Sequence, residues 1–83
     1  MMDFVLLTKT IVDMLVKNKE AVSVSEYETD DENLIQIEVM VDSDDLGIVI
    51  GKNGKTITSI RNIVQASATI NGGKKIKINV DSY

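Results

Sequence analysis

The sequence contains no cysteine, no histidine and no proline among its 83 residues. Without cysteine and histidine, the chain can form no disulfide, and it lacks thiolate nucleophiles, imidazole acid–base groups and the usual ligands of a zinc site. A chain this short must commit nearly all of its apolar residues to one core. We therefore expect a single domain over residues 1–83 that is stabilised by packing, binds no cofactor or metal, and is not an enzyme.

Long apolar runs are absent as well. The run from Phe4 to Leu7 is followed at once by Thr8 and Lys9. It is too short for the core of a signal peptide or for a membrane span. We therefore expect a cytoplasmic protein that does not interact with a membrane.

The charges are distributed unevenly along a chain whose formal net charge is −4. Residues 1–45 hold twelve acids and three lysines, whereas residues 46–80 hold no acid and six bases: Lys52, Lys55, Arg61, Lys74, Lys75 and Lys77. A basic segment on an acidic carrier suits a protein that binds an anion on one face. The alternative is that the asymmetry only reflects solvation of the surface.

The spacing of the apolar residues predicts the order α-β-β-α-α-β. Residues 3–19 form an amphipathic helix with Asp3 as N-cap and a stripe of Phe4, Leu7, Ile11, Met14 and Leu15. Residues 21–28 and 34–41 alternate as two strands joined by an acidic loop, and residues 75–80 alternate as a third. Between them, residues 46–50 form a short helix capped by Asp42, Asp44 and Asp45, and a longer helix extends to about residue 70.

This order predicts an α+β fold with a three-stranded mixed sheet. Because crossovers between strands through helices are overwhelmingly right-handed, the last strand should return parallel to the second. All three helices then pack on one face of the sheet.

The segment Gly51-Lys52-Asn53-Gly54 lies between the two later helices. Glycines allow a ligand to approach the main chain, and the helix that begins at Lys55 offers unpaired N–H groups and a partial positive charge. Lys52 and Lys55 add charge at the same place. These features favour a phosphate-binding loop, with a plain helix–helix turn as the alternative.

The run from Ile50 to Ile57, with Gly47 ahead of it, resembles the Gly-x-x-Gly signature of KH domains, whose loop clamps about four nucleotides. The element order is similar to that of type II KH domains. Residues 11–16, 45–52 and 58–61 extend the resemblance to the small stand-alone KH proteins of the KhpA (YlqC) family, over essentially residues 2–81. The chain departs from that family after the first helix, where an Asn-Pro turn is common, and at Asn53, where Gln is common.

The resemblance implies binding of single-stranded RNA, and a role as a bacterial RNA chaperone or post-transcriptional regulator. Gly51, Lys52, Asn53, Gly54 and Lys55 would contact phosphates, and Ile48 and Ile50 would support bases. Lys74 and Lys75 are expected to close on the groove across from Lys52. Arg61 is a candidate phosphate contact, with a purely solvent-exposed role as the alternative. Because the three aromatic residues Phe4, Tyr27 and Tyr83 lie outside this groove, we expect weak, backbone-directed recognition.

Three rival interpretations use the same residues. Gly54-Lys55-Thr56 imitates the end of an NTPase phosphate loop, but Val49 stands where that loop needs a glycine. The acids at residues 42, 44 and 45 lack the register of a calcium loop. A protein–protein adaptor remains open, because Val5, Val12 and Val16 widen the apolar surface of the first helix beyond its core stripe. We expect a homodimer through such a surface, and the family resemblance also implies a partner of the KhpB (Jag) type.

Overall fold

A computed structural model describes residues 2–83. Its elements are α1 (Phe4–Leu15), β1 (Ser23–Tyr27), β2 (Leu34–Val41), α2 (Leu46–Ile50), α3 (Lys55–Ile70) and β3 (Lys75–Ser82), with 3-10 turns at Lys19–Ala21, Ser43–Asp45 and Lys52–Gly54. The predicted order α-β-β-α-α-β is confirmed. The first helix ends four residues earlier than predicted, and the chain then makes the first of these 3-10 turns.

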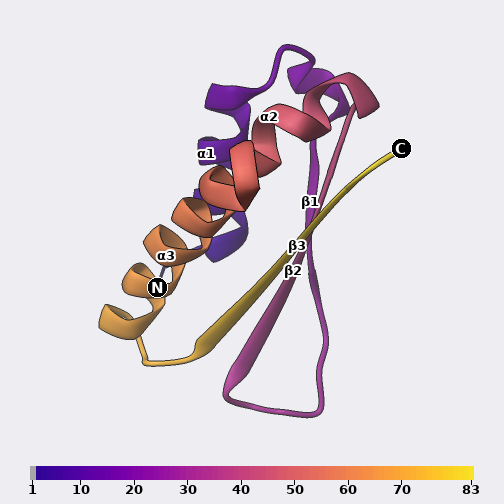
Figure 1. Ribbon diagram of the computed structural model, residues 1–83. Coiled ribbons are helices and arrows are strands. Elements are labelled where there is room, and N and C mark those ends of the chain that lie inside the picture. The colour runs from indigo at the N-terminus through magenta and orange to yellow at the C-terminus, as the bar shows by residue number, and fades with distance from the viewer. Residues whose placement is uncertain (1) are drawn as a thin grey trace.

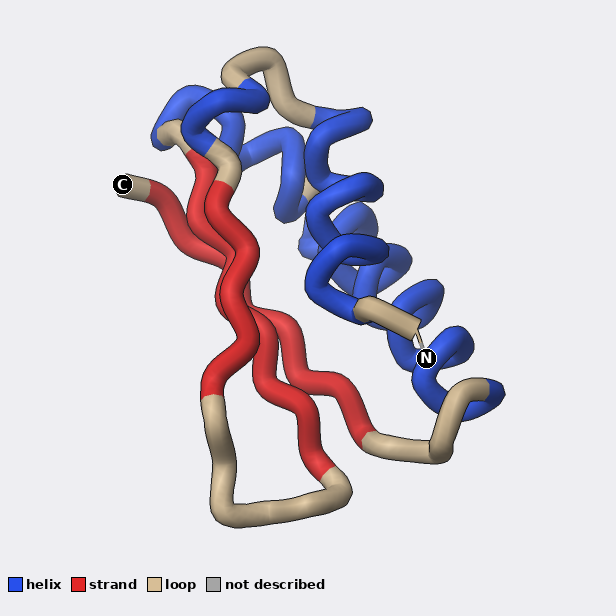
Figure 2. Tube along the Cα trace, turned by 180° about the vertical axis from the view of Figure 1, so that it is seen from behind, coloured by secondary structure: helices blue, strands red, loops and turns tan. Residues whose placement is uncertain are grey.

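The sheet has the strand order β1-β2-β3, with β1 antiparallel and β3 parallel to β2. Ile37 lies beside Ile78, and Val39 lies between Val24 and Val80. Figures 1 and 2 show the three helices on one face of this sheet, while the other face is uncovered. The predicted mixed α+β sandwich is therefore confirmed.

The core forms where alternate strand residues meet the helices. β2 contributes Ile37, Val39 and Val41, all of which are buried, and Ile78 of β3 lies beside them. α3 covers these residues with the buried side chains of Ile57, Ile60, Val64 and Ala68. Each buried valine or isoleucine side chain contributes about 1.5–3 kcal/mol when it leaves water, which is how a small domain without disulfides is stabilised.

The buried face of α1 differs from the predicted stripe. Asp3 caps the helix as expected, its Oδ1 accepting from the Leu6 N–H at 3.0 Å. However, Val12 and Val16 lie in the core, and Met14, predicted to be buried, is 75 % exposed. α1 packs against both β1 and α3, so its buried arc is wider than one stripe and takes in the valines. The expectation that Val12 and Val16 form an exposed flank is wrong.

One isoleucine of α3 also departs from prediction. Helical spacing predicts an apolar face of Ile57, Ile60, Ile63, Val64 and Ala68. However, Ile63 is 53 % exposed, and Ile70 at the end of the helix is 83 % exposed. They are seven residues apart and so lie on the same side of the helix, turned from the buried Val64. Among residues 2–83, no helix has the length and apolar character that crossing a membrane requires.

Candidate nucleic-acid interface

A buried carboxylate fixes the position of α2. Asp45 is only 4 % exposed, and its two oxygens accept hydrogen bonds from the backbone N–H groups of Lys17 at 3.1 Å and Asn18 at 3.0 Å. These two residues follow α1, whereas Asp45 immediately precedes Leu46, the first residue of α2. The carboxylate therefore joins the end of one helix to the start of another that carries the glycine loop.

Asp42 supports the same junction from outside. Its Oδ1 accepts from the Asp44 N–H at 2.9 Å, and its Oδ2 accepts from the side-chain amide of Asn18 at 3.2 Å. Asp42 thus caps the turn as predicted. Asp45 does not cap its own helix but turns inward, a role that spacing alone did not indicate. Because both carboxylates accept hydrogen bonds from the chain itself, a calcium site is not needed to explain them.

The surroundings of Asp45 lower the pKa of its carboxyl group below the usual value of 3.8. The hydrogen bonds from the Asn18 and Lys17 N–H groups are the main cause, burial opposes them, and the charges of Lys17 and Lys19 assist. Since the folded pKa lies below the unfolded one, the ionised carboxylate stabilises the fold at neutral pH. This contribution disappears as the pH falls through the folded pKa.

We expect Asp45→Asn to lower the free energy of unfolding at pH 7. An amide offers one acceptor oxygen to two N–H donors and presents an N–H group to the second. Urea denaturation should show the largest gap between parent and variant near neutral pH, and a narrowing gap from about pH 5 downward. A gap that stays constant down to about pH 2 would contradict this role for the ionised carboxylate.

The loop Gly51–Gly54 adopts backbone conformations that most residues avoid. Gly51 has φ 77° and ψ 170°, a region populated almost only by glycine, and Gly54 is left-handed with φ 72° and ψ 15°. Asn53 is left-handed too, with φ 57° and ψ 26°, and asparagine is one of the few side chains that tolerate this. The chain thereby turns sharply between α2 and α3.

Two backbone N–H groups of this loop are open. The Gly51 N–H donates to the Gly47 oxygen at 2.9 Å, the Gly54 N–H to the Gly51 oxygen at 3.1 Å, and the Lys55 N–H to the Lys52 oxygen. In contrast, the N–H groups of Lys52 and Asn53 find no partner within residues 2–83. The expectation that the Lys55 N–H is unpaired is therefore wrong, and the open donors lie earlier in the loop.

Gly51→Ala and Gly54→Ala should differ sharply in cost. A Cβ on Gly51 would lie 2.9 Å from the Thr56 backbone nitrogen and closer still to its side chain, whereas a Cβ on Gly54 would meet nothing within 4 Å. We expect Gly54→Ala to lose about 1–2 kcal/mol from its left-handed backbone. Gly51→Ala should lose about 3 kcal/mol or more, because a clash adds to the strain. Urea denaturation of both variants measures this; equal losses would contradict the loop geometry.

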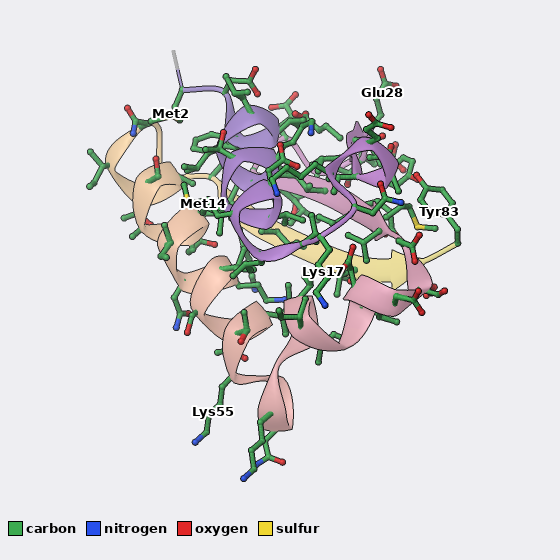
Figure 3. All side chains as sticks on the ribbon, turned by 90° about the horizontal axis from the view of Figure 1, so that it is seen from above. Met2, Met14, Lys17, Glu28, Lys55 and Tyr83 are labelled. Atoms are coloured by element: carbon green, nitrogen blue, oxygen red, sulfur yellow. The ribbon has the colours of Figure 1, made fainter. Side chains whose placement is uncertain are left out.

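The loop presents its charge to solvent. Lys52, Asn53 and Lys55 are all exposed. Figure 3 shows Lys55 projecting away from the body of the domain. The acids of the β1–β2 loop lie far from it, at the end of the sheet away from α2, so they do not neutralise the lysines (Figure 1).

The two isoleucines of α2 differ in what they offer a ligand. Ile48 is 51 % exposed, while Ile50 packs partly against the core and Val49 between them is fully buried. Ile48 can therefore present an apolar surface beside the loop. Ile50 contributes only the part of its side chain that the core leaves open.

Three of the predicted site residues lie away from the loop. α3 is about 24 Å long for its 16 residues, and Lys74 and Lys75 follow its far end. Lys74 also lines a separate hollow of about 490 Å³, together with Phe4 and Ile35. The expectation that Lys74 and Lys75 close on the groove across from Lys52 is thus wrong. Arg61 has a different place again: its Nε donates to the Ile78 oxygen at 3.0 Å, joining α3 to β3.

The part of the sheet that lies nearest the loop is the later half of β3. This strand returns along α3, so its C-terminal residues come beside α2 (Figure 1). The Lys75 N–H donates to the Asn33 oxygen and the Tyr83 N–H to the Val41 oxygen, both on the side of β2. Odd-numbered residues of β3 therefore direct their backbone N–H and C=O groups toward β2. Even-numbered residues therefore direct their N–H and C=O groups to the free edge. Val80 is one of these residues, and prediction missed it.

No aromatic side chain stands at the loop. Tyr27 lies on the uncovered face of the sheet, Phe4 lines the distant hollow, and Figure 3 shows Tyr83 well away from Lys55. A ligand at this site would therefore meet aliphatic groups, open backbone donors and lysine charges. Such a set suits an extended anionic chain whose bases are not stacked on rings.

Known proteins resemble the chain in both sequence and fold. The family described as KhpA/KhpB, KH domain, matches residues 6–80. Relatives called RNA-binding protein KhpA are 43 % identical in Halalkalibacterium halodurans (74 % of this chain, 83 % of the relative) and 36 % identical in Oceanobacillus iheyensis (89 % and 95 %). A third, from Thermotoga maritima, is 38 % identical over 89 % of this chain and 93 % of the relative.

Among solved structures, the fold resembles part of Era in complex with MgGDPNP and nucleotides 1506–1542 of 16S ribosomal RNA. The TM-score is 0.68 with 19 % identity, and the match covers 95 % of this chain but 29 % of Era. This likeness concerns the fold alone. The family match over residues 6–80, together with relatives of similar length, shows that the chain belongs to the KhpA/KhpB family of KH-domain proteins, which is not a family of enzymes.

Proposed function

We propose that the protein binds single-stranded RNA and holds its backbone with the loop Gly51–Gly54. The observation that carries this proposal is the pair of open N–H groups on Lys52 and Asn53. They lie on an exposed glycine turn that also carries the side chains of Lys52 and Lys55. Backbone donors and lysine charges together are the usual means of holding a phosphodiester. The names of the KhpA relatives support the same ligand.

The bases would lie between Ile48 on α2 and the free edge of β3 at Val80. Ile48 offers an apolar contact, and the backbone of Val80 offers one donor and one acceptor. Only an unpaired base can enter such a groove, because in duplex RNA the hydrogen-bonding edges are already used. We therefore propose weak and sequence-tolerant binding, which suits a cytoplasmic RNA chaperone or post-transcriptional regulator acting on many RNAs.

Changing Lys52 and Asn53 together to aspartate should abolish RNA binding and leave the domain folded. Both side chains are exposed, and aspartate tolerates the left-handed backbone of position 53. Two carboxylates would stand beside the open N–H groups and repel the phosphates. Fluorescence anisotropy with a short single-stranded RNA should show an affinity at least about 100-fold weaker, near the limit of detection.

The matched control is Lys77→Asp with Asn79→Asp, which changes the net charge equally on the uncovered face of the sheet. It should bind RNA nearly like the parent. If the loop variant is folded by circular dichroism and still binds like the parent, Gly51–Gly54 is only a turn. In that case the adaptor function without RNA binding is favoured.

We further propose a homodimer through an apolar face shared by α1 and α3. The exposed apolar side chains of these two helices are those of Leu6, Met14, Ile63 and Ile70, each more than half exposed. Since α1 and α3 pack side by side, we propose that these side chains contribute to one helical surface. A surface of this kind is costly in water and suits pairing about a two-fold axis. A KhpB (Jag) protein is a second candidate partner for the same face.

Ile63→Asp should convert the dimer to a monomer. A carboxylate at the centre of an apolar interface would have to be buried unpaired. Sedimentation at micromolar concentration should then give a mass near 9.1 kDa, against about twice that for the parent. Tyr27→Asp, at a side chain that is 52 % exposed on the uncovered sheet face, is the control and should remain dimeric. A parent that sediments as a monomer would refute the proposal.

A further inference from the structure

Two side chains of α3 cross to the free edge of β3 and occupy its backbone groups. Gln65 makes two such bonds: its Nε2 donates to the Lys74 oxygen at 3.0 Å, and its Oε1 accepts from the Ile76 N–H at 2.9 Å. One turn earlier on the helix, Arg61 Nε donates to the Ile78 oxygen at 3.0 Å. The two side chains therefore take three backbone groups along the first half of the strand edge, and only the Ile76 oxygen and the Ile78 N–H between them have no side-chain partner within residues 2–83.

The next part of that edge carries no side chain of α3. Even-numbered residues of β3 direct their N–H and C=O groups to the edge, and Val80 is the next of them after Ile78. No side chain within residues 2–83 bonds to the N–H or C=O group of Val80, and the Ser82 N–H beyond it donates to Asp81 Oδ1 at 2.8 Å. The edge thus differs on the two sides of Arg61: Val80 is open on the side of α2 and the glycine loop, whereas Arg61 and Gln65 lie across the edge on the side of Lys74 and Lys75.

We infer that Arg61 and Gln65 form a stop that ends the RNA groove and sets the length of RNA that it holds. The inference rests on the proposed RNA binding at the loop. A base that enters beside Val80 finds an open donor and acceptor, whereas a base further along would meet the side chains of Arg61 and Gln65, which hold three of the edge groups there. The bound strand must therefore leave the groove at Arg61.

Lys74 and Lys75 lie beyond this stop and do not face Lys52. They stand beyond Gln65, at the far end of α3, so a strand that leaves at Arg61 does not reach them. Their charges would act on RNA only if the edge between Arg61 and Lys74 were opened. This consequence can be tested because Gln65 carries no charge, and its removal changes no direct ionic contact with RNA.

The test compares oligouridylates of increasing length, from about four to about ten nucleotides. For the parent, affinity should level off at about four nucleotides, the span that a KH loop clamps. Beyond that length, affinity should rise only because a longer RNA offers more positions at which the loop can bind. Gln65→Ala should bind the four-nucleotide RNA like the parent but gain about threefold or more for the longest one. Adding Lys74→Ala should remove that gain, although Lys74→Ala alone has no effect.

Gln36→Ala, on the uncovered face of the sheet, is the matched control and should follow the parent. Gln65→Met is a second variant that keeps a long side chain without a donor or acceptor of similar strength, and it guards against loss of fold in Gln65→Ala. If both Gln65 variants are folded and show the parent's dependence on length, the stop is wrong while loop binding stands. If the parent binds none of these RNAs, the proposed function itself fails, and the stop with it.

Discussion

The glycine loop owes its position to a carboxylate that lies outside it. Asp45 holds the N–H groups of Lys17 and Asn18 and so joins the turn after α1 to the start of α2. α2 has only five residues, too few to be stable or well placed by itself. Everything that follows in the chain up to Lys55 depends on this anchor and on the burial of Val49 beside it.

From that anchor, a small number of backbone angles decide the shape of the site. Gly51 turns the chain where almost no other residue can, and Asn53 and Gly54 continue the turn with left-handed angles. The result is that consecutive N–H groups of Lys52 and Asn53 are left without partners in the described chain. In a helix continuing from α2, the same groups would have been consumed by intrahelical hydrogen bonds.

Much of the fold could be predicted because its signals are local. The alternation of residues 34–41 identified β2 to the residue, and the pattern from Lys75 onward identified β3. The faces of α1 and α3 were predicted less well. Each of these helices touches both the sheet and the other helix, so Val12 is buried and Ile63 exposed for reasons of tertiary packing that a helical period does not contain.

The candidate site shows the same division. The loop and its lysines could be found from the glycine spacing, since the needed conformations are local. The part of β3 that faces the loop could not be found from the sequence, because it depends on which end of β3 comes beside α2. The length of α3 was an available signal: a 16-residue helix separates the loop from Lys74 by its own length. The inward turn of Asp45 had no local signal, as its partners are 27 and 28 residues away.

The parallel pairing of β2 with β3 has a consequence for how the protein and its ligand depend on each other. The two sides of the proposed groove are the loop at Gly51–Gly54 and the end of β3, and α3 separates them along the chain. They meet only when this long-range pairing has formed, which is a slow and cooperative step in folding. A fragment that lacks β3 has only one of these two sides, so a ligand that spans both would bind only the complete fold. Ligand concentration would then act on the folding equilibrium of the whole domain by mass action.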